Sequence, residues 1–167
     1  MGLVKKVVLF ILCSNFVFAT EFNFKDVSLD EFKIYGISKN IEYKSKEHRD
    51  ILILGLWEEF FNSKAFVKSK SKDVLMVIYT GYKKNSFDCF IGVKSQREIL
   101  GVDEKIVKKT KFNKTSIAYN KEIKMNQLWD EINKMKIKRD FKMDIEEYLI
   151  SDLIKPSYNF NVYLSKK

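Results

Sequence analysis

Two segments of the chain carry apolar residues at steps of three and four positions. The first runs from about residue 47 to 61 and surrounds Trp57, and the second surrounds Trp129. This spacing places the apolar side chains on one face of an α-helix. The sequence therefore predicts two amphipathic helices. Their apolar positions are Ile53, Leu56, Trp57, Phe60 and Phe61 in the first helix, and Met125, Leu128, Trp129, Ile132 and Met135 in the second.

Segments rich in β-branched and aromatic residues flank both predicted helices, which is typical of strands. In each half of the chain one such segment precedes the helix and two follow it. Each half therefore has the predicted order β-α-β-β. The predicted strands span residues 32–43, 74–82 and 87–94 in the first half, and 111–123, 142–150 and 158–164 in the second.

The two helices share a short string of residues, which indicates a duplicated unit. Leu56-Trp57-Glu58-Glu59-Phe60 is echoed by Leu128-Trp129-Asp130-Glu131-Ile132, at an offset of 129 − 57 = 72 residues. We predict one α+β domain over residues 20–167, with repeats at about 32–95 and 111–165. Because each helix has one apolar stripe to bury, both should pack on one face of an antiparallel-rich sheet. A central groove is then expected on the other face.

The first nineteen residues have the composition of an export signal. Lys5 and Lys6 give a positive start, residues 7–13 are all apolar, and Ala19 is small enough for a cleavage site. Polar residues at 14 and 15 end the apolar stretch well short of the roughly 20 residues that span a membrane. We predict cleavage after Ala19 and a periplasmic or secreted protein with no stable membrane insertion. Retention of the segment as an anchor is the alternative.

The chain is basic, with 31 Lys and Arg against 22 Asp and Glu and a formal net charge of +9. Removal of the signal takes away two lysines and no acids, so the mature charge is 9 − 2 = +7. Nucleic-acid binding needs such charges clustered on one face or in one groove. Here the lysines lie mostly around predicted loops and element ends, interleaved with acids. We therefore expect a solvated surface and no nucleic-acid partner, with weak attraction to an anionic envelope surface as the alternative.

Side chains alternate between the two faces of a strand. In the predicted strand 142–150, Met143, Ile145 and Leu149 face one way, while Glu146 and Tyr148 face the other. A groove at the junction of two repeats is a common ligand site. This strand therefore presents an acid and an aromatic ring together on one face of the predicted sheet.

A set of short strings carries a family resemblance through its order and spacing. The strings are Ile53-Leu54-Gly55-Leu56-Trp57-Glu58-Glu59-Phe60, Val77-Ile78-Tyr79-Thr80-Gly81-Tyr82, Phe87-Asp88-Cys89-Phe90-Ile91-Gly92-Val93, Leu128-Trp129 and Asp144-Ile145-Glu146-Glu147-Tyr148, followed by the closing strand 158–164. In this order they resemble the GyrI-like effector-binding domain, also called the bacterial transcription activator effector-binding domain, which occurs fused to AraC-type and MerR-type regulators and alone. The likeness covers about residues 32–164, nearly all of the mature chain.

The resemblance implies a duplicated β-α-β-β fold that binds small, often cationic or aromatic, molecules in a central groove. Members of the family place a carboxylate from the second half at the floor of the groove, and Glu146 matches it by position. A carboxylate ringed by aromatic faces suits a lipophilic cation, because the acid offsets the charge and the rings contact the rest. Glu147 takes this role if the strand register is shifted by one. The other candidates for ligand contact are Tyr148, Tyr79, Tyr82, Tyr119, Trp57 and Trp129, each with ordinary core packing as the alternative.

The sequence departs from the regulators of this family in two ways. It carries no helix-turn-helix module, and an export signal would separate the protein from DNA. We therefore expect a stand-alone binding domain in the cell envelope rather than a transcription switch.

Few residues support enzyme chemistry. His48, the one histidine, lies among charged residues at a helix start, where a solvated side chain is expected. Cys89, the one cysteine of the mature chain, lies in an apolar strand, so we expect no disulfide and an inert thiol. No metal-ligand spacing and no glycine-rich phosphate loop occur, so no metal or cofactor is expected. Two alternatives to binding are a hydrolase with Glu146 as general base, and a protein-interaction module that uses an exposed sheet edge or the basic surface.

Overall fold

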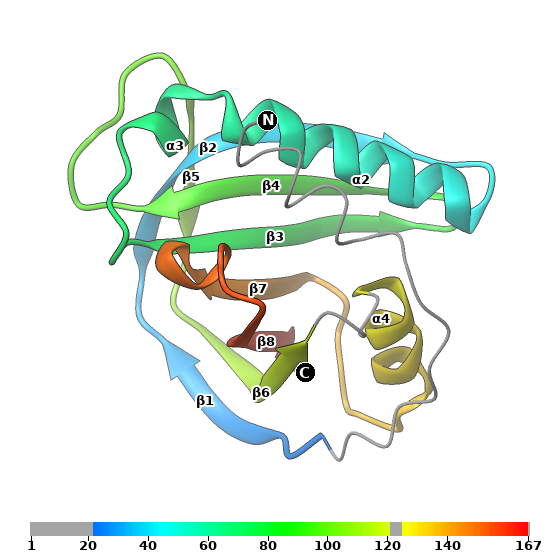
Figure 1. Ribbon diagram of the computed structural model, residues 1–167. Helices are drawn as coiled ribbons and strands as arrows, with labels where there is room; N and C mark the ends of the chain where they lie inside the picture. Colours follow the sequence, from blue (N-terminus) through cyan, green and yellow to red (C-terminus); the bar gives the residue numbers. More distant parts are fainter. Residues whose placement is uncertain (1–21, 121–124, 167) are drawn as a thin grey trace.

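The computed structural model describes residues 22–120 and 125–166 (Figure 1). The predicted export signal lies outside these residues. No helix within the described ranges is long and apolar enough to cross a membrane. The elements are β1 (Lys25–Leu29), β2 (Phe32–Glu42), α2 (Lys46–Phe61), α3 (Lys64–Val67), β3 (Val74–Lys83), β4 (Ser86–Lys94), β5 (Asp103–Val107), β6 (Thr110–Asn120), α4 (Met125–Lys134), β7 (Met143–Leu149), the 3-10 turn η1 (Ile150–Asp152) and β8 (Ser157–Ser165).

Eight strands form one curled sheet in the order β1-β6-β8-β7-β3-β4-β2-β5, and each neighbouring pair is antiparallel. From the central pair outward, the first half reads β3-β4-β2-β5 and the second reads β7-β8-β6-β1. The two halves therefore have the same strand order about the centre. This arrangement confirms the α+β fold of duplicated β-α-β-β units predicted from the sequence.

Strands β1 and β5 were not predicted, and each crosses to the other half of the sheet. β1 pairs with β6, while β5 pairs with β2. The turns that follow β1 and β5 meet through two ion pairs, Lys108 to Glu31 at 3.0 Å and Lys109 to Asp30 at 3.2 Å. This exchange of edge strands ties the two repeats into one sheet.

A close approach between two glycines shapes the first half of the sheet. Gly36 of β2 lies directly opposite Gly92 of β4. A Cβ atom on Gly36 would lie 1.9 Å from the carbonyl oxygen of Ile91, which is far inside van der Waals contact. Glycine is required at this position because only a residue without a side chain lets the backbones come this close.

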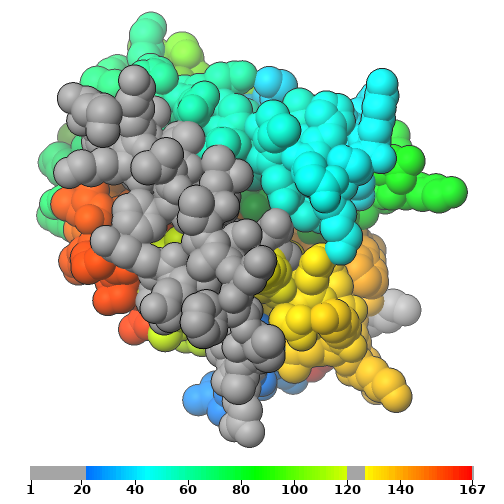
Figure 2. Space-filling view, turned by 45° about the vertical axis from the view of Figure 1, so that its right-hand side comes forward, coloured from blue at the N-terminus to red at the C-terminus, as the bar shows by residue number. Residues whose placement is uncertain are grey.

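The helices lie on one side of the sheet (Figure 1). Helix α2 begins at Ser45, whose hydroxyl accepts from the backbone N–H of His48 at 3.2 Å, as a helix N-cap does. Near this end Lys46 forms an ion pair with Asp130 of α4 at 2.9 Å. Figure 2 shows the first turns of α2 next to α4 at the molecular surface.

Strand alternation divides the buried side chains into two clusters. The helix-side cluster includes Leu56, Val77 and Tyr148, and the cluster on the opposite face includes Met76 and Ile145. The candidate ligand-binding side chains share the helix-side cluster, whereas we expected the groove on the face away from the helices. Alternation determines which residues share a face, but it does not determine which face the helices cover.

Candidate functional site

Glu146 lies at the middle of β7, one of the two central strands, and is 2% exposed. Three protein groups donate hydrogen bonds to its carboxylate. Oε1 accepts from the Tyr79 hydroxyl at 3.1 Å and from the Trp129 indole N–H at 2.5 Å. Oε2 accepts from the Tyr148 hydroxyl at 2.7 Å. The acid is therefore held in one orientation by donors from three directions.

The fold brings these donors together from three elements. Tyr148 is two residues along β7 and so shares the face of Glu146. Tyr79 lies on the neighbouring strand β3, where Val77 pairs with Glu146, so that Tyr79 is the diagonal neighbour. Trp129 comes from α4, which carries the indole across the sheet face. Two of the three donors thus follow from strand register, and the third depends on where the helix packs.

Aromatic rings surround this carboxylate. The Trp129 ring meets the Tyr79 ring edge to face, with centroids 5.5 Å apart. Trp57 of α2 meets the Tyr148 ring in the same way at 6.0 Å. Tyr148 also stacks on Phe160, with ring centroids 5.0 Å apart and an interplanar angle of 12°. The acid and its three donors therefore lie in largely aromatic surroundings.

Burial raises the pKa of the Glu146 carboxyl, and the three hydrogen bonds from Tyr148, Trp129 and Tyr79 oppose that shift without cancelling it. None of the ion pairs formed by the described residues involves Glu146. Burial and the nearby carboxylate raise the pKa values of the Tyr79 and Tyr148 hydroxyls well above the ordinary tyrosine value. Both hydroxyls therefore stay protonated and act as donors.

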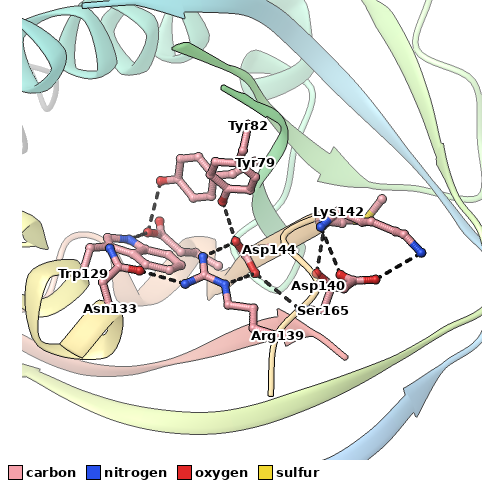
Figure 3. A network of polar contacts seen from close by, with 11 residues as sticks. Tyr79, Tyr82, Trp129, Asn133, Arg139, Asp140, Lys142, Asp144 and Ser165 are labelled. Carbon is pink, nitrogen blue, oxygen red and sulfur yellow. Dashed lines mark hydrogen bonds and ion pairs between the residues drawn. The ribbon is translucent and has the colours of Figure 1, made fainter. Parts of the chain in front are cut away.

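A second buried carboxylate lies two residues earlier on the same strand face (Figure 3). Asp144 is fully buried and forms an ion pair with Arg139 through both oxygens. Its Oδ2 also accepts from the Tyr82 hydroxyl at 2.5 Å, and its Oδ1 accepts from the backbone N–H of Ser165 at 3.3 Å. This carboxylate is satisfied entirely from within the chain.

The guanidinium of Arg139 is itself packed against aromatic rings. It lies 4.4 Å from the Phe141 ring centroid and 5.7 Å from that of Trp129. Its Nη1 donates to the Asn133 side chain at 2.8 Å. Because Trp129 also donates to Glu146, its indole contacts both the Arg139–Asp144 ion pair and the Glu146 carboxylate.

The other predicted residues lie on the same sheet face, and among the hydrogen bonds of the described residues none of them donates to the Glu146 carboxylate. Tyr82 donates to Asp144 instead. Tyr119 packs on Tyr158 at 4.8 Å, and Tyr158 in turn lies 6.3 Å from Tyr148. Trp57 meets the site through its ring contact with Tyr148. The structure therefore brings Tyr79, Trp129 and Tyr148 to the acid and places the other three around them.

Glu147, the competing acid, lies on the opposite face of the sheet. Its Oε1 accepts from Asn161 at 2.7 Å and from the Tyr163 hydroxyl at 2.9 Å. Tyr163 belongs to the opposite-face cluster. The register is therefore the unshifted one, in which Glu146 faces the aromatic rings.

The groups weighed for enzyme chemistry are engaged elsewhere. His48 lies in the first turn of α2, and its Nδ1 accepts from the backbone N–H of Lys44 at 3.3 Å. Cys89 is a buried thiol whose pKa is raised well above its ordinary value by burial. Within the described residues, no group of three or more His, Cys, Asp or Glu side chains is arranged to hold a metal ion. What the site offers chemically is a buried carboxyl group held by three donors, with aromatic rings beside it.

The sequence prediction missed three residues of this region, namely Asp144, Arg139 and Tyr158. Asp144 has the same alternation as Glu146, which would have placed it on the same strand face. Tyr158 begins a predicted strand of alternating aromatic residues. Arg139 lies between α4 and β7, where no periodic pattern exists, so nothing in the sequence signals its pairing.

Known proteins share this fold at low sequence identity. SAV2435, solved bound to tetraphenylphosphonium, is 13% identical with a TM-score of 0.68, covering 87% of this chain and 94% of its own. An integron cassette protein from the mobile metagenome of Vibrio cholerae is 17% identical with a TM-score of 0.64, covering 87% and 97%. A putative bacterial transcription regulation protein from Staphylococcus aureus is 12% identical with a TM-score of 0.65, covering 88% and 100%.

No curated protein matches the chain significantly. The model of one protein family, described as Cass2, integron-associated effector binding protein, matches residues 27–165. That range holds both β-α-β-β units and every candidate residue of the site. The chain therefore belongs to the integron-associated effector binding protein family, one of the GyrI-like families, as the resemblance implied.

Proposed function

We propose that the protein binds a lipophilic organic cation on the helix-side face of the sheet, with Glu146 as its counter-charge. The observation that carries this proposal is a buried carboxylate for which the described residues provide three neutral donors and no cation. An ionised carboxylate in such surroundings is costly unless an opposite charge accompanies it. A bound cation would supply that charge.

The surrounding rings favour a particular kind of cation. Ring faces attract a positive charge within about 6 Å of their centroids, and the attraction is largest when the charge is removed from water. A cation with apolar or aromatic substituents loses little hydration on entering such a site. The family's description as effector binding supports a small-molecule ligand, and the tetraphenylphosphonium bound by the structurally similar SAV2435 supports a lipophilic cation.

The direct test compares two probes of nearly the same shape and opposite charge. Tetraphenylphosphonium and tetraphenylborate are titrated into the protein by calorimetry. We expect the phosphonium ion to bind and the borate ion to bind at least tenfold more weakly, because Glu146 attracts one and repels the other. Equal affinity for both ions would show that apolar contact alone accounts for binding.

Variants of the two adjacent acids assign the charge to one residue. Glu146→Gln keeps an oxygen to accept from Trp129 but removes the charge, so tetraphenylphosphonium should bind about 10- to 100-fold more weakly. Glu147→Gln makes the same change on the opposite face of the same strand and serves as the matched control. Loss of affinity in the control, or unchanged affinity in Glu146→Gln, would overturn the proposal.

We also propose that the protein is exported and acts outside the cytoplasm. The sequence of residues 1–19, with its positive start, apolar run and small residue at 19, supports this proposal. Fractionation followed by N-terminal sequencing tests it. The expected product is a periplasmic or secreted chain that begins at Thr20, and a full-length chain confined to the cytoplasm would contradict export.

A further inference from the structure

Arg139 connects the strand of Glu146 to the helix of Trp129 (Figure 3). On the strand side, its Nε and Nη2 donate to the two oxygens of Asp144, which lies two residues before Glu146 on the same face of β7. On the helix side, its Nη1 donates to Asn133 at 2.8 Å, and its guanidinium lies 5.7 Å from the ring centroid of Trp129. One buried side chain therefore contacts both elements that bring the acid and its indole donor together.

The two contacts of Arg139 with α4 lie one helical turn apart. Trp129 and Asn133 are separated by four residues, so their side chains share one face of the helix. A guanidinium is planar and its N–H groups point in fixed directions, so a guanidinium held by a carboxylate restrains both the distance and the rotation of the helix that it contacts. Burial of Leu128 and Ile132 also fixes α4 on the sheet, but apolar contact is non-directional. The contacts with Arg139 add the direction in which the indole points.

From these contacts, and resting on the proposed function, we infer that Arg139 is a positioning residue for the ligand site: it holds the Trp129 indole against the Glu146 carboxylate and thereby sets the affinity for the cation. None of the side-chain hydrogen bonds that Arg139 donates among the described residues goes to Glu146, so its effect passes through Trp129. The indole hydrogen bond lowers the pKa of Glu146 against the effect of burial. Without this bond the carboxyl keeps its proton up to a higher pH, and its neutral form does not attract a cation.

The pH dependence of cation binding can report the state of Glu146. The titratable groups described around this acid are the hydroxyls of Tyr79, Tyr148 and Tyr158 and the Cys89 thiol. Burial raises the pKa of each of these groups above its ordinary value, so all four stay neutral between about pH 5 and pH 8. The Arg139–Asp144 pair lies on the same face, so a variant that keeps both of its charges is the informative one.

Arg139→Lys tests the positioning role, because it keeps the positive charge and removes the planar group that holds Asp144 and Asn133 together. The pKa of Glu146, followed by carbon-13 NMR in the ligand-free protein, should rise by roughly half a pH unit. Tetraphenylphosphonium should bind about threefold more weakly below the pKa of Glu146, and this loss should shrink as pH rises above it. An unchanged Glu146 pKa, or a loss of affinity that is equal at every pH, would overturn the inference.

Two further variants show whether the effect passes through the indole. Trp129→Phe removes the hydrogen bond at its donor and keeps an aromatic ring, so adding Arg139→Lys to it should change neither the affinity nor the Glu146 pKa further. Additive effects would contradict a role that acts through Trp129. Asn133→Ala, at an exposed position, releases Arg139 from α4 and leaves the ion pair with Asp144 intact. It should shift the Glu146 pKa in the same direction, and it decides the question in the same way if Arg139→Lys does not fold.

Lys46→Gln is the control, because it removes the exposed ion pair with Asp130 that also connects α4 to α2. Exposed ion pairs contribute little, so the affinity should stay within about twofold and the Glu146 pKa should not move. Losses equal to those of Arg139→Lys would mean that any loosening of α4 has this effect, which would overturn the role given to Arg139. Failure of tetraphenylphosphonium to bind the unaltered protein would instead overturn the proposed function, and the ligand-free NMR comparison would still test whether Arg139 positions the indole.

Discussion

Asp144 and Glu146 lie two residues apart on one face of β7, and both carboxylates are buried. Their surroundings differ in the partners that they provide. Asp144 has Arg139 as a cationic partner, whereas Glu146 has only neutral donors among the described residues. Asp144 is therefore paired within the chain, whereas Glu146 is the acid that the proposed cation would accompany.

The comparison shows why burial alone does not identify a ligand site. In a buried ion pair whose hydrogen bonds are complete, each charge already has its counter-charge. A buried acid that accepts hydrogen bonds from neutral groups is held in one orientation, but it has no counter-charge. Trp129 contacts the partners of both acids, because its ring packs against Arg139 and its indole N–H donates to Glu146. The Arg139–Asp144 ion pair therefore also helps to position the indole that orients the Glu146 carboxylate.

The largest expected effect on stability comes from breaking the ion pair between Arg139 and Asp144. Asp144→Asn leaves the buried guanidinium of Arg139 without a counter-charge, and the free energy of unfolding should fall by about 3–5 kcal/mol. Urea denaturation followed by circular dichroism measures this change. A loss below about 1 kcal/mol would mean that the pair contributes no more than an exposed salt bridge does.

Replacing both members of the pair should be tolerated better than removing one. Arg139→Met combined with Asp144→Leu removes both buried charges, so the double variant should recover at least half of the stability that Asp144→Asn loses. The same denaturation experiment checks this. If the double variant is no more stable than the single one, the cost arises from lost packing rather than from an unpaired charge.

The stability of the protein should depend on pH through Glu146. Burial raises the pKa of this group in the folded state, so the folded protein binds more protons than the unfolded chain at pH values above the ordinary glutamate pKa. The contribution of Glu146 to stability is therefore greatest at low pH and falls as pH rises from that ordinary value through the raised pKa.

The comparison with Glu146→Gln isolates this pH dependence. Unfolding measured over a range of pH should give a difference between the two proteins that moves in favour of the glutamine variant as pH rises. A difference that stays constant with pH would show that the folded state does not raise this pKa. Cation binding should have the opposite dependence and become tighter as the carboxylate ionises.

The smallest expected effect is that of Glu146→Gln on stability at neutral pH. The amide oxygen can accept from Trp129, the amide group can donate to Tyr148, and an uncompensated buried charge is removed. The free energy of unfolding should therefore change by less than about 1 kcal/mol or increase. A loss as large as that of Asp144→Asn would mean that the two acids have the same structural role.

The sequence was sufficient to predict the features that depend on short-range patterns. Apolar spacing around Trp57 and Trp129 predicted both helices, and strand alternation correctly separated Glu146 and Tyr148 from Ile145. The edge strands β1 and β5 escaped prediction because each is five residues long and pairs with a strand of the distant repeat. Local propensity carries little information about such pairings.

The contacts of the candidate site depended more on tertiary packing. Alternation placed Glu146 on a face, but the indole hydrogen bond from Trp129 arises from the packing of α4 over that face. The partner of Asp144 could not be foreseen, because Arg139 lies in an irregular segment with no periodicity. The two neighbouring acids of β7 consequently look alike in the sequence and differ only in the folded chain.

The central claim is that Glu146 is the counter-charge of a bound cation. A crystal structure with tetraphenylarsonium tests it most directly, because the anomalous signal of arsenic locates the charge centre. The account predicts one arsenic site on the helix-side face, next to the Glu146 carboxylate and within about 6 Å of ring centroids that include those of Trp129 and Tyr148. An arsenic site on the opposite face, next to Glu147 or distant from both acids, would contradict it.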